Sequence, residues 1–565
     1  MYVLGINCFL HDSAATLLKD GEILAAAEEE RFTRRKHEKD FPRRAIRYCL
    51  TTAGIEIHQV DYIGFFWNPR LTLKMGISHA IRYFPRGLPY ALGMGYIFFL
   101  LHKVKKLLRQ EFHLNLGEGS PKFLYVDHHF AHAASTFFLS PFEEAAVITI
   151  DGQGEIDSAV FFQGKNNVFQ KLKSVKFPHS LGLCYASVTK YLGFKPDSDE
   201  YKVMGLAPYG EPTYIDLFRK IIQTESEGTY KIDLTYFDYW TSTSPEGWVS
   251  PKFVEAFGPP RKEGDPLEKR HRDIAASLQQ ALEEGAFHML RWLRKETGQD
   301  RLCLAGGVGM NCTMNGKICK NTGFREVFVQ PVAYDAGTSL GTALYIYHYL
   351  LNNPRKLVMS HTSYGPEYAN DSIGELLRRF KLTHYEFTEN IAEKTARFLA
   401  DGKIVGWFQG RMEFGARALG SRSILAHPGI AKMKDLVNAC VKYREGFRPF
   451  APSVLEEKAG EYFELEGKAP FMTLTCQVLD DKRKEVPAIT HVDGTSRIQT
   501  VSKETNPLYW QLLKEFEKIT GIPMVLNTSF NVQGEPIVCT PEEAIRCFFS
   551  TGLDYLVLGN YILWK

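Results

Sequence analysis

Residues 126–132 read Val-Asp-His-His-Phe-Ala-His, and the function of the chain is best approached from this stretch. Asp127 is a good N-cap, so we expect a helix to begin there, with the carboxylate accepting from first-turn N–H groups. His128 and His132 would then lie one turn apart on one face, where two imidazoles can share a metal ion. Asp151 ends an apolar β-type run and could bring a carboxylate to the same point. The alternative is a helix with hydrogen-bonded histidines on a partly buried face.

Length and composition limit the class of protein. A chain of 565 residues is long enough for two or three domains, because single cores stop growing near ~250–300 residues. A net charge of +3 gives no indication of nucleic-acid binding. The ten cysteines form no CxxC pair, which argues against zinc ribbons and disulfide frameworks and suits a reducing compartment. Because Met1 leads directly into a strand-like start, we predict a cytoplasmic protein without a signal peptide.

The apolar segment 87–101 is shorter than the ~20 residues that a membrane-spanning helix requires, and it contains Pro89. We expect a buried helix or a docking surface there rather than a membrane span. The charged stretch 28–39 is typical of a solvated face.

The N-terminus has the pattern of a strand meander. Apolar strands are expected at 2–6, 14–18 and 23–27, and an Asp-Gly turn joins the last two. His11 and Asp12 lie in the first loop, where the alternative to a catalytic role is side-chain capping of a turn. Strand–loop–strand at an N-terminus is how the sugar-kinase, heat-shock ATPase and actin superfamily builds its first phosphate loop.

The same arrangement recurs at 145–150 and 158–162, on either side of a glycine-rich turn. Apolar residues at helical spacing predict packed helices at 183–192 and 272–297. The region 208–264 lacks clear periodicity, and we interpret it as an irregular insertion that shapes an acceptor pocket.

Two glycine-rich helix starts follow in the sequence. Gly306 and Gly307 come after a strand and before Asn311, so a nucleotide could lie against bare backbone near a helix N-terminus. Asp335 stands before Ala-Gly-Thr-Ser-Leu-Gly and offers another carboxylate, for which the alternative role is an ordinary N-cap.

A polar, proline-bounded segment at 353–366 is predicted to be a linker. Beyond it, basic residues stand among glycine, serine and aromatic residues. Because guanidinium groups present a rigid fork of donors, this composition favours an oxyanion site. The residues concerned include Arg411, Arg417, Arg422, Lys442, Arg444, Arg448, Arg497, Asn527 and Ser529.

Together, these motifs resemble the O-carbamoyltransferase family (the NodU/CmcH and TobZ type) over essentially the whole chain. The resemblance rests on GINCFLHDSAATLL (5–18), DHHFAHA (127–133), DGQGE (151–155), LAGGVGMN (304–311), AYDAGTSLG (333–341), GRMEFGARALGSRS (410–423), REGFRPFAP (444–452) and LNTSFN (526–531).

The resemblance implies an α/β protein with two modules. Residues 1–352 would form an actin-like/sugar-kinase (ASKHA) domain with a duplicated ribonuclease-H-like fold, of the threonylcarbamoyl-transfer type. Residues 367–565 would form a YrdC-like α/β domain that makes carbamoyl-AMP from carbamoyl phosphate and ATP, with Mg²⁺ accompanying the ATP. The first domain would then move the carbamoyl group to a hydroxyl of a sugar, antibiotic or glycan precursor.

The resemblance also implies roles for individual residues. His128, His132, Asp151 and Asp335 would hold a metal, His11 would be the catalytic base with Asp12 orienting it, and Gly306, Gly307 and Asn311 would lie along the nucleotide. Carbamoyl phosphate and ATP would bind Arg417, Lys442, Arg448, Arg497, Asn527 and Ser529, with Lys39 reaching in from the first domain.

Mixed nitrogen and oxygen ligands suit Fe²⁺ or Mn²⁺ better than a structural Zn²⁺. The resemblance implies that the metal is iron, with Mn²⁺ or Zn²⁺ as alternatives. Two other functions compete with O-carbamoyl transfer. A tRNA threonylcarbamoyl transferase would call for a basic face, which the near-neutral charge does not favour. A non-catalytic nucleotide-binding protein of the same fold would not need the arginine set. No nucleic-acid partner is expected, and the acceptor and a homodimeric state are left open.

Overall fold

The computed structural model describes residues 1–114, 121–243 and 248–565. The chain forms two compact units. Unit 1 consists of Met1–Glu29 and His37–Met359, and unit 2 consists of Glu30–Lys36 and Ser360–Lys565. The last passage between them, after Met359, falls inside the segment 353–366 that we expected to be a linker.

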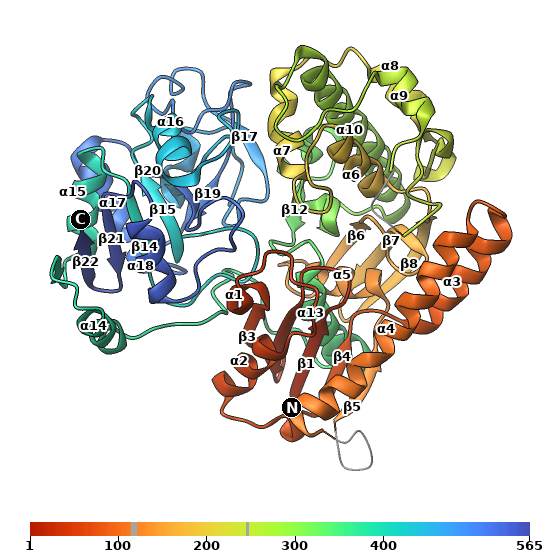
Figure 1. Ribbon diagram of the computed structural model, residues 1–565, viewed down its shortest axis with the longest axis horizontal. Coiled ribbons are helices and arrows are strands. Elements are labelled where there is room, and N and C mark those ends of the chain that lie inside the picture. The colour runs from red at the N-terminus through yellow and green to blue at the C-terminus, as the bar shows by residue number, and fades with distance from the viewer. Residues whose placement is uncertain (115–120, 244–247) are drawn as a thin grey trace. The chain divides into compact units, whose positions relative to one another are not determined.

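Unit 1 contains two five-stranded sheets with the same strand order. The first has the order β3-β2-β1-β4-β5, and its strands are β1 (Tyr2–Asn7), β2 (Ala14–Lys19), β3 (Glu22–Glu28), β4 (Tyr62–Phe65) and β5 (Lys122–Tyr125). The second has the order β8-β7-β6-β11-β12, and its strands are β6 (Glu144–Ile150), β7 (Asp157–Lys165), β8 (Val168–Lys176), β11 (Arg301–Ala305) and β12 (Glu326–Val329). In each sheet an antiparallel meander is followed by two parallel strands. This repeated topology confirms the predicted duplicated actin-like/sugar-kinase architecture (Figure 1).

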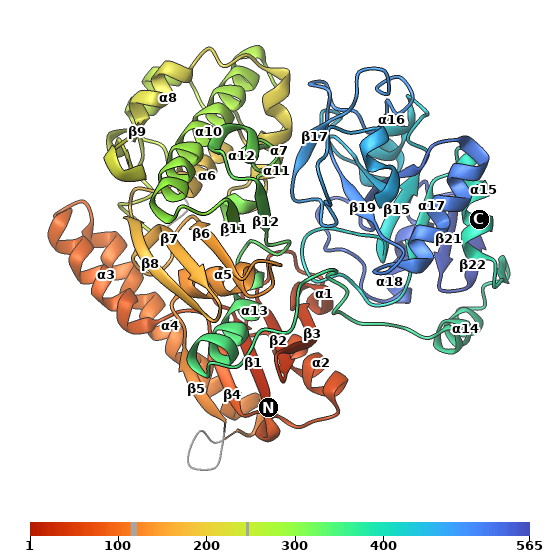
Figure 2. The ribbon, with the colours of Figure 1, turned by 180° about the vertical axis from the view of Figure 1, so that it is seen from behind.

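Two short helices lie against each other between these sheets (Figure 2). Helix α13 (Ala336–Leu344) packs on β1 and β2, whereas α5 (His128–Phe137) packs on β6 and β11. Glycines permit this close approach. A Cβ atom on Gly341 would lie 1.8 Å from the carbonyl oxygen of Ala131 in α5, and one on Gly5 would lie 1.9 Å from the carbonyl oxygen of Ser339.

The remaining helices of unit 1 include those predicted at 183–192 and 272–297, and both are confirmed. The other helices of unit 1 include α2 (Arg43–Ala53), α3 (Pro69–Arg82), α4 (Leu88–Phe112), α6 (Leu181–Tyr191), α7 (Glu200–Leu206) and α10 (Lys269–Thr297). The apolar segment 87–101 lies almost entirely in α4. Among the described residues, no helix combines the length and the apolar composition needed to cross a bilayer.

The region 208–264 is more ordered than its composition indicated. It contains α8 (Ile215–Ile221), α9 (Pro251–Phe257) and the antiparallel pair β9 (Ile222–Thr224) and β10 (Tyr230–Ile232). The prediction of an irregular region was therefore wrong. The sequence did not reveal these elements because each is too short to produce a visible periodicity. Residues 244–247 of this region lie outside the described residues.

The stretch 28–39 is not the solvated face that its charge suggested. Its middle, residues 30–36, belongs to unit 2, and Arg31 is only 4% exposed. The Arg31 guanidinium donates to the carbonyl oxygen of Gly415 at 2.8 Å. Arg34 donates to the carbonyl oxygens of Pro536 and Ile537, each at 2.7 Å. The charges are tolerated inside the unit because backbone oxygens accept their hydrogen bonds.

Unit 2 is built on an eight-stranded mixed sheet of order β13-β22-β21-β14-β15-β20-β16-β19. The strands are β13 (Tyr385–Phe387), β14 (Val405–Phe408), β15 (Arg422–Ala426), β16 (Ala451–Leu455), β19 (Gln499–Val501), β20 (Met524–Ser529), β21 (Tyr555–Leu558) and β22 (Tyr561–Trp564). Helices α15 (Ile391–Ala400) and α17 (Pro507–Thr520) contribute to one core, and α14 (Asn370–Arg379), α16 (Met433–Val437) and α18 (Pro541–Phe549) to another.

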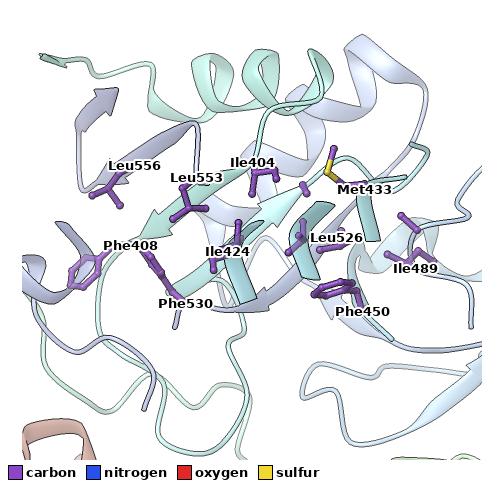
Figure 3. Packing of buried hydrophobic residues seen from close by; sticks show 14 of the residues in the cluster. Ile404, Phe408, Ile424, Met433, Phe450, Ile489, Leu526, Phe530, Leu553 and Leu556 are labelled. Atoms are coloured by element: carbon purple, nitrogen blue, oxygen red, sulfur yellow. The ribbon is translucent and has the colours of Figure 1, made fainter. Parts of the chain in front are cut away.

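The second of these cores is shown in Figure 3, where Ile424 on β15 and Leu526 on β20 lie in one cluster with Ile404, Met433 and Phe450. The α/β class is confirmed for both units, and the YrdC-like assignment of unit 2 stays a prediction.

The glycine contacts lead to a stability prediction. Gly341→Ala should lower the free energy of unfolding by about 1–3 kcal/mol, because the added methyl would collide with backbone that cannot move independently of α5. Gly95→Ala is the matched control, since that glycine is also helical and its Cβ would meet nothing within 4 Å. We expect it to be neutral or to stabilise by about 0.5–1 kcal/mol. Denaturant unfolding of both variants measures the difference, and equal effects would contradict the packing argument.

Candidate metal centre and anion site

Four side chains that are distant in sequence meet in unit 1. His128 and His132 are one turn apart on α5, Asp151 directly follows β6, and Asp335 directly precedes α13. Each offers a ligand atom, and these atoms all lie within 4.8 Å of one another. The Nε2 atom of His132 lies 3.0 Å from an oxygen of Asp151 and 3.5 Å from one of Asp335. The corresponding distances from His128 are 3.6 and 3.8 Å.

The surroundings of these residues fit a divalent metal. All four are buried, and neither ring nitrogen of His128 or His132 has a hydrogen-bond partner among the described residues. A buried polar atom without a partner is costly, and a metal ion among the carboxylates would give the Nε2 atom of each ring a partner. Two imidazoles and two carboxylates form a donor set that suits Fe²⁺, Mn²⁺ or Zn²⁺.

The pKa shifts of His132 and Asp151 also indicate a cation site. Burial lowers the pKa of His132, but the carboxylates of Asp151 and Asp335 raise it more, to about 9. The pKa of Asp151 is held well below its ordinary value, because the two histidines outweigh the effect of burial. Without an ion, a proton on an imidazole must therefore compensate the carboxylates. A bound divalent cation would take over that role.

The N-terminus of α5 is capped differently from our expectation. Asp127 makes no side-chain capping bond and instead accepts from Asn68 Nδ2 at 2.9 Å. The carboxylate of Glu155 accepts from the His128 backbone N–H at 3.1 Å and from that of Asn68 at 2.7 Å. The prediction for Asp127 was wrong, because a residue distant in sequence occupies the cap.

His129, between the two candidate ligands, has the structural role that we considered as the alternative for the whole motif. Its two ring nitrogens lie 2.8 Å from Thr149 Oγ1 and 2.8 Å from the carbonyl oxygen of Asp157. Burial lowers its pKa to about 3, so it is neutral at physiological pH.

His11 lies beside the four-residue cluster. Its Nε2 atom is 3.6 Å from Asp335, and its Nδ1 atom is 2.9 Å from Asp12. The other oxygen of Asp12 lies 2.8 Å from His37 Nδ1, so one carboxylate orients two imidazoles. Asn7 Nδ2 donates to the carbonyl oxygens of both Asp12 and Asp335, at 2.8 and 2.9 Å, and joins the two loops. We did not foresee His37 or Asn7 as parts of this arrangement.

The glycine pair at 306–307 contacts the end of β6. A Cβ atom on Gly306, whose φ is +92°, would lie 2.3 Å from the carbonyl oxygen of Ile150. The backbone N–H of Gly307 donates to the Asp151 carboxylate at 3.0 Å. These contacts position Asp151, whatever else the loop binds. Asn311 caps α11 (Cys312–Asn315) and exchanges two side-chain hydrogen bonds with Gln279, so its amide is already engaged within unit 1.

A second cluster, in unit 2, is centred on a buried lysine. The Lys442 ammonium lies 2.6–3.2 Å from backbone and side-chain oxygens of Ser529 and Asn531. Burial lowers the pKa of Lys442 well below its ordinary value, and the nearby positive charges of Arg444 and Arg448 lower it further. A bound anion would relieve this repulsion, so the cluster suits a phosphate or carboxylate ligand.

Other predicted anion-site residues lie on two strands of unit 2, β20 and β18 (Thr495–Arg497). Asn527 precedes Ser529 on β20, and its side-chain N–H₂ donates to Ser453 Oγ and to the carbonyl oxygen of Ala418, next to Arg417. Its Oδ1 atom is buried without a hydrogen-bond partner among the described residues. Arg497 lies on β18, opposite Thr475 on β17 (Thr475–Gln477).

Arg422 has a structural role that its motif did not reveal. It is fully buried, and its guanidinium donates to the carbonyl oxygens of Gln409, Gly410 and Pro366 while lying 3.6 Å from the centre of the Phe408 ring. It was wrong to count Arg422 with the oxyanion-binding arginines, because backbone oxygens already accept from it.

Lys39 and Lys36 occupy different units. Lys39 belongs to unit 1, where its charge acts on the carboxyl group of Asp197. Lys36 belongs to unit 2 and is close enough to Lys442 to lower the pKa of that ammonium. Lys36 therefore belongs with the basic cluster of unit 2, and the role of Lys39 at the donor site stays a prediction.

Comparison with known proteins identifies the family. A model of the carbamoyltransferase N-terminus matches residues 2–344, and a model of the carbamoyltransferase C-terminus matches residues 396–565. The chain belongs to the carbamoyltransferase family. The predicted family is therefore confirmed, and this carbamoyltransferase is an enzyme.

Its relatives are similar over most of their length. The carbamoyltransferase is 43% identical to the uncharacterized protein sll1178 of Synechocystis, with 100% of this chain and 97% of the relative covered. It is 41% identical to nodulation protein NolNO of Sinorhizobium fredii, with 99% and 80% covered. Nodulation protein NolO of Bradyrhizobium diazoefficiens is 44% identical over 78% of this chain and 79% of the relative.

Among solved structures, component A of the Acidaminococcus fermentans (R)-2-hydroxyglutaryl-CoA dehydratase matches 62% of the chain and 99% of its own, with 17% identity and a TM-score of 0.34. So distant a similarity carries no argument about function.

The geometry of unit 1 predicts that metal binding depends on His132. His132→Ala should lose its bound divalent metal, and Fe²⁺ or Mn²⁺ should raise the melting temperature of the unsubstituted chain but not of this variant. His129→Gln is the matched control on the same helix: it should keep the metal while losing about 1–3 kcal/mol of stability, because it leaves buried partners unsatisfied. Elemental analysis and thermal unfolding measure both quantities. Equal metal content in the two variants would contradict this site.

Proposed function

We propose that this carbamoyltransferase transfers a carbamoyl group to a hydroxyl through carbamoyl-AMP, which unit 2 makes and unit 1 consumes. The observation that carries the proposal is the buried two-histidine, two-aspartate cluster of unit 1 with His11 beside Asp335. The basic cluster around Lys442 supports the assignment of the anionic donor to unit 2. The acceptor would be a sugar, an antibiotic or a glycan precursor.

In unit 2, carbamoyl phosphate would first react with water to give carbamate and inorganic phosphate. A carbamate oxygen would then attack the α-phosphorus of ATP, forming carbamoyl-AMP and releasing pyrophosphate. Lys442 and Arg448 would neutralise the anions that collide in this step, which is the main contribution a protein makes to phosphoryl and nucleotidyl transfer. Ser529 and Asn531 hold the Lys442 ammonium in place for that role.

In unit 1, His128, His132, Asp151 and Asp335 would hold the metal, which when bound supplies a positive charge near the reacting carbonyl or phosphate. His11 would accept the proton of the acceptor hydroxyl as its oxygen attacks the carbamoyl carbon, and the bond to AMP would break. Burial lowers the pKa of His11, but Asp335 and Asp12 raise it more. A cation on Asp335 would reduce that effect and favour the neutral imidazole that a base requires.

Two variants test the two half-reactions separately. Arg448→Ala should reduce carbamoyl-phosphate-dependent pyrophosphate release from ATP about 10²–10³-fold, because it removes a charge from the anion site. His11→Ala should leave pyrophosphate release intact but reduce, about 10²–10⁴-fold, the formation of products one carbamoyl group heavier in extracts analysed by mass spectrometry.

Arg546→Ala is a control in unit 2, since that arginine lies on α18 with its side chain 61% exposed. Unchanged pyrophosphate release in Arg448→Ala would contradict the assignment of the anion site to this cluster. No carbamoyl-phosphate-dependent pyrophosphate release by the unsubstituted protein would overturn the proposal and favour a non-catalytic nucleotide-binding protein. A carbamoylated or threonylcarbamoylated product that appears only on addition of tRNA would favour the tRNA-modifying alternative.

The positions of Lys36 and Lys39 give a paired prediction. Lys36→Met should raise the KM for carbamoyl phosphate or ATP in the pyrophosphate assay about tenfold, since it removes one charge from the basic cluster. Lys39→Met, three residues away but in unit 1, should leave that KM unchanged. Steady-state kinetics of both variants decide the question, and the reverse result would return Lys39 to the donor site.

A further inference from the structure

Helices α3 and α4 form an antiparallel hairpin that is attached to unit 1 by its inner face. The two helices pack tightly on each other (Figures 1 and 2). His79 Nε2 lies 2.8 Å from the carbonyl oxygen of Trp240, and Tyr90 donates from its hydroxyl to Gln153 at 2.5 Å. Met75 and Met94 are buried with them. These contacts fix one face of the hairpin and leave the opposite face without a partner among the described residues.

The outward face carries an unusual number of large apolar side chains. They are Leu73, Ile77 and Ile81 on α3, Phe84 in the turn, and Leu88, Leu92, Tyr96 and Phe99 on α4. Ile81, Phe84 and Phe99 are more than two-thirds exposed, at 76%, 74% and 71%. The spacing of three and four residues places each set on one side of its helix. Single exposed apolar residues are ordinary, but eight large ones on one helical hairpin indicate a binding surface.

Beyond the exposed apolar side chains of α4, the same side of the helix carries lysines. Lys103 stands one helical turn beyond Phe99 and Lys106 two turns beyond it, on the same side, and both are exposed. Residues 69–112 contain eight lysines and arginines and one acidic residue, a net charge of +7 in a chain whose overall charge is +3. The acidic residue, Glu111, lies 3.3 Å from Arg43 of α2.

We propose that the α3–α4 hairpin docks unit 1 onto the surface of a bilayer that contains anionic lipids. The apolar side chains of the outward face would enter the headgroup boundary, while Lys103 and Lys106 beyond them would contact lipid phosphates. An apolar face flanked by basic residues, on helices too polar to span, is the composition of an interfacial membrane anchor. The inference is independent of the acceptor chemistry proposed above.

Charge decides among the alternatives. A second copy of the chain would bring another +7 hairpin against the first, and the like charges would repel unless they were offset. A nucleic acid would contact the lysines and arginines but would gain nothing from eight exposed apolar side chains. An anionic bilayer is complementary to both features.

Flotation of the full-length protein with vesicles tests the proposal. Binding is expected to phosphatidylcholine vesicles that contain about 30% phosphatidylglycerol, to weaken at high salt, and to be much weaker with pure phosphatidylcholine. Lys103→Gln with Lys106→Gln should weaken binding to the anionic vesicles about fivefold for each lysine. Leu92→Ser with Phe99→Ser should weaken it at least tenfold, since the apolar part of the anchor is lost.

Ile519→Ser with Phe549→Ser is the matched control, because both side chains are 50% exposed in unit 2. It should bind the vesicles like the unsubstituted protein. Unchanged melting temperatures would show that all variants are folded. The proposal is overturned if the unsubstituted protein does not float with anionic vesicles, or if the hairpin and control variants bind equally. A dimer in sedimentation velocity that Leu92→Ser with Phe99→Ser converts to monomer would assign the face to a second copy instead.

Discussion

The close approach of α13 to α5 and β1 is the constraint on which the candidate active site depends. Gly341 allows α13 to touch the backbone of Ala131, and Gly5 allows β1 to touch the backbone of Ser339. Asp335 stands immediately before α13, and His128 and His132 lie on α5. A side chain at Gly341 would push α13 away from α5, and one at Gly5 would push α13 away from β1. Either shift would move Asp335 relative to His128 and His132. The sheet duplication matters to function through this contact, since each sheet is covered by a helix that follows strands of the other.

The two units have opposite electrostatic requirements. Unit 1 buries two carboxylates with two histidines that lack hydrogen-bond partners among the described residues, an arrangement that a cation would complete. Unit 2 buries an ammonium group near two arginines, an arrangement that an anion would complete. In both units a bound ligand would further offset the cost of burying these charges. A metal in one unit and a phosphate donor in the other are what the carbamoyltransfer chemistry proposed above requires.

Residues 30–36, although close to the N-terminus, belong to unit 2. The chain enters unit 2 at Glu30, returns to unit 1 at His37 and leaves it finally after Met359. The short excursion is held by Arg31 and Arg34, whose guanidinium groups donate to backbone carbonyl oxygens. It also brings Lys36 to the basic cluster of unit 2. One N-terminal segment thus contributes to both units, with His37 on Asp12 directly after Lys36.

The amino-acid sequence by itself determined the features that depend on neighbouring residues. These include the strand meander at 2–27, the helical pairing of His128 with His132, the apolar helices and, through several motifs in order, the family. Tertiary structure alone decided which polar groups meet. Glu155, rather than Asp127, accepts the first-turn N–H of α5, and backbone oxygens accept the hydrogen bonds of Arg422. Lys36, which we did not predict, lies near Lys442. The reason is that a buried charged group must form hydrogen bonds with donors or acceptors within about 3 Å. The fold determines which groups lie that close, and they can come from any part of the chain.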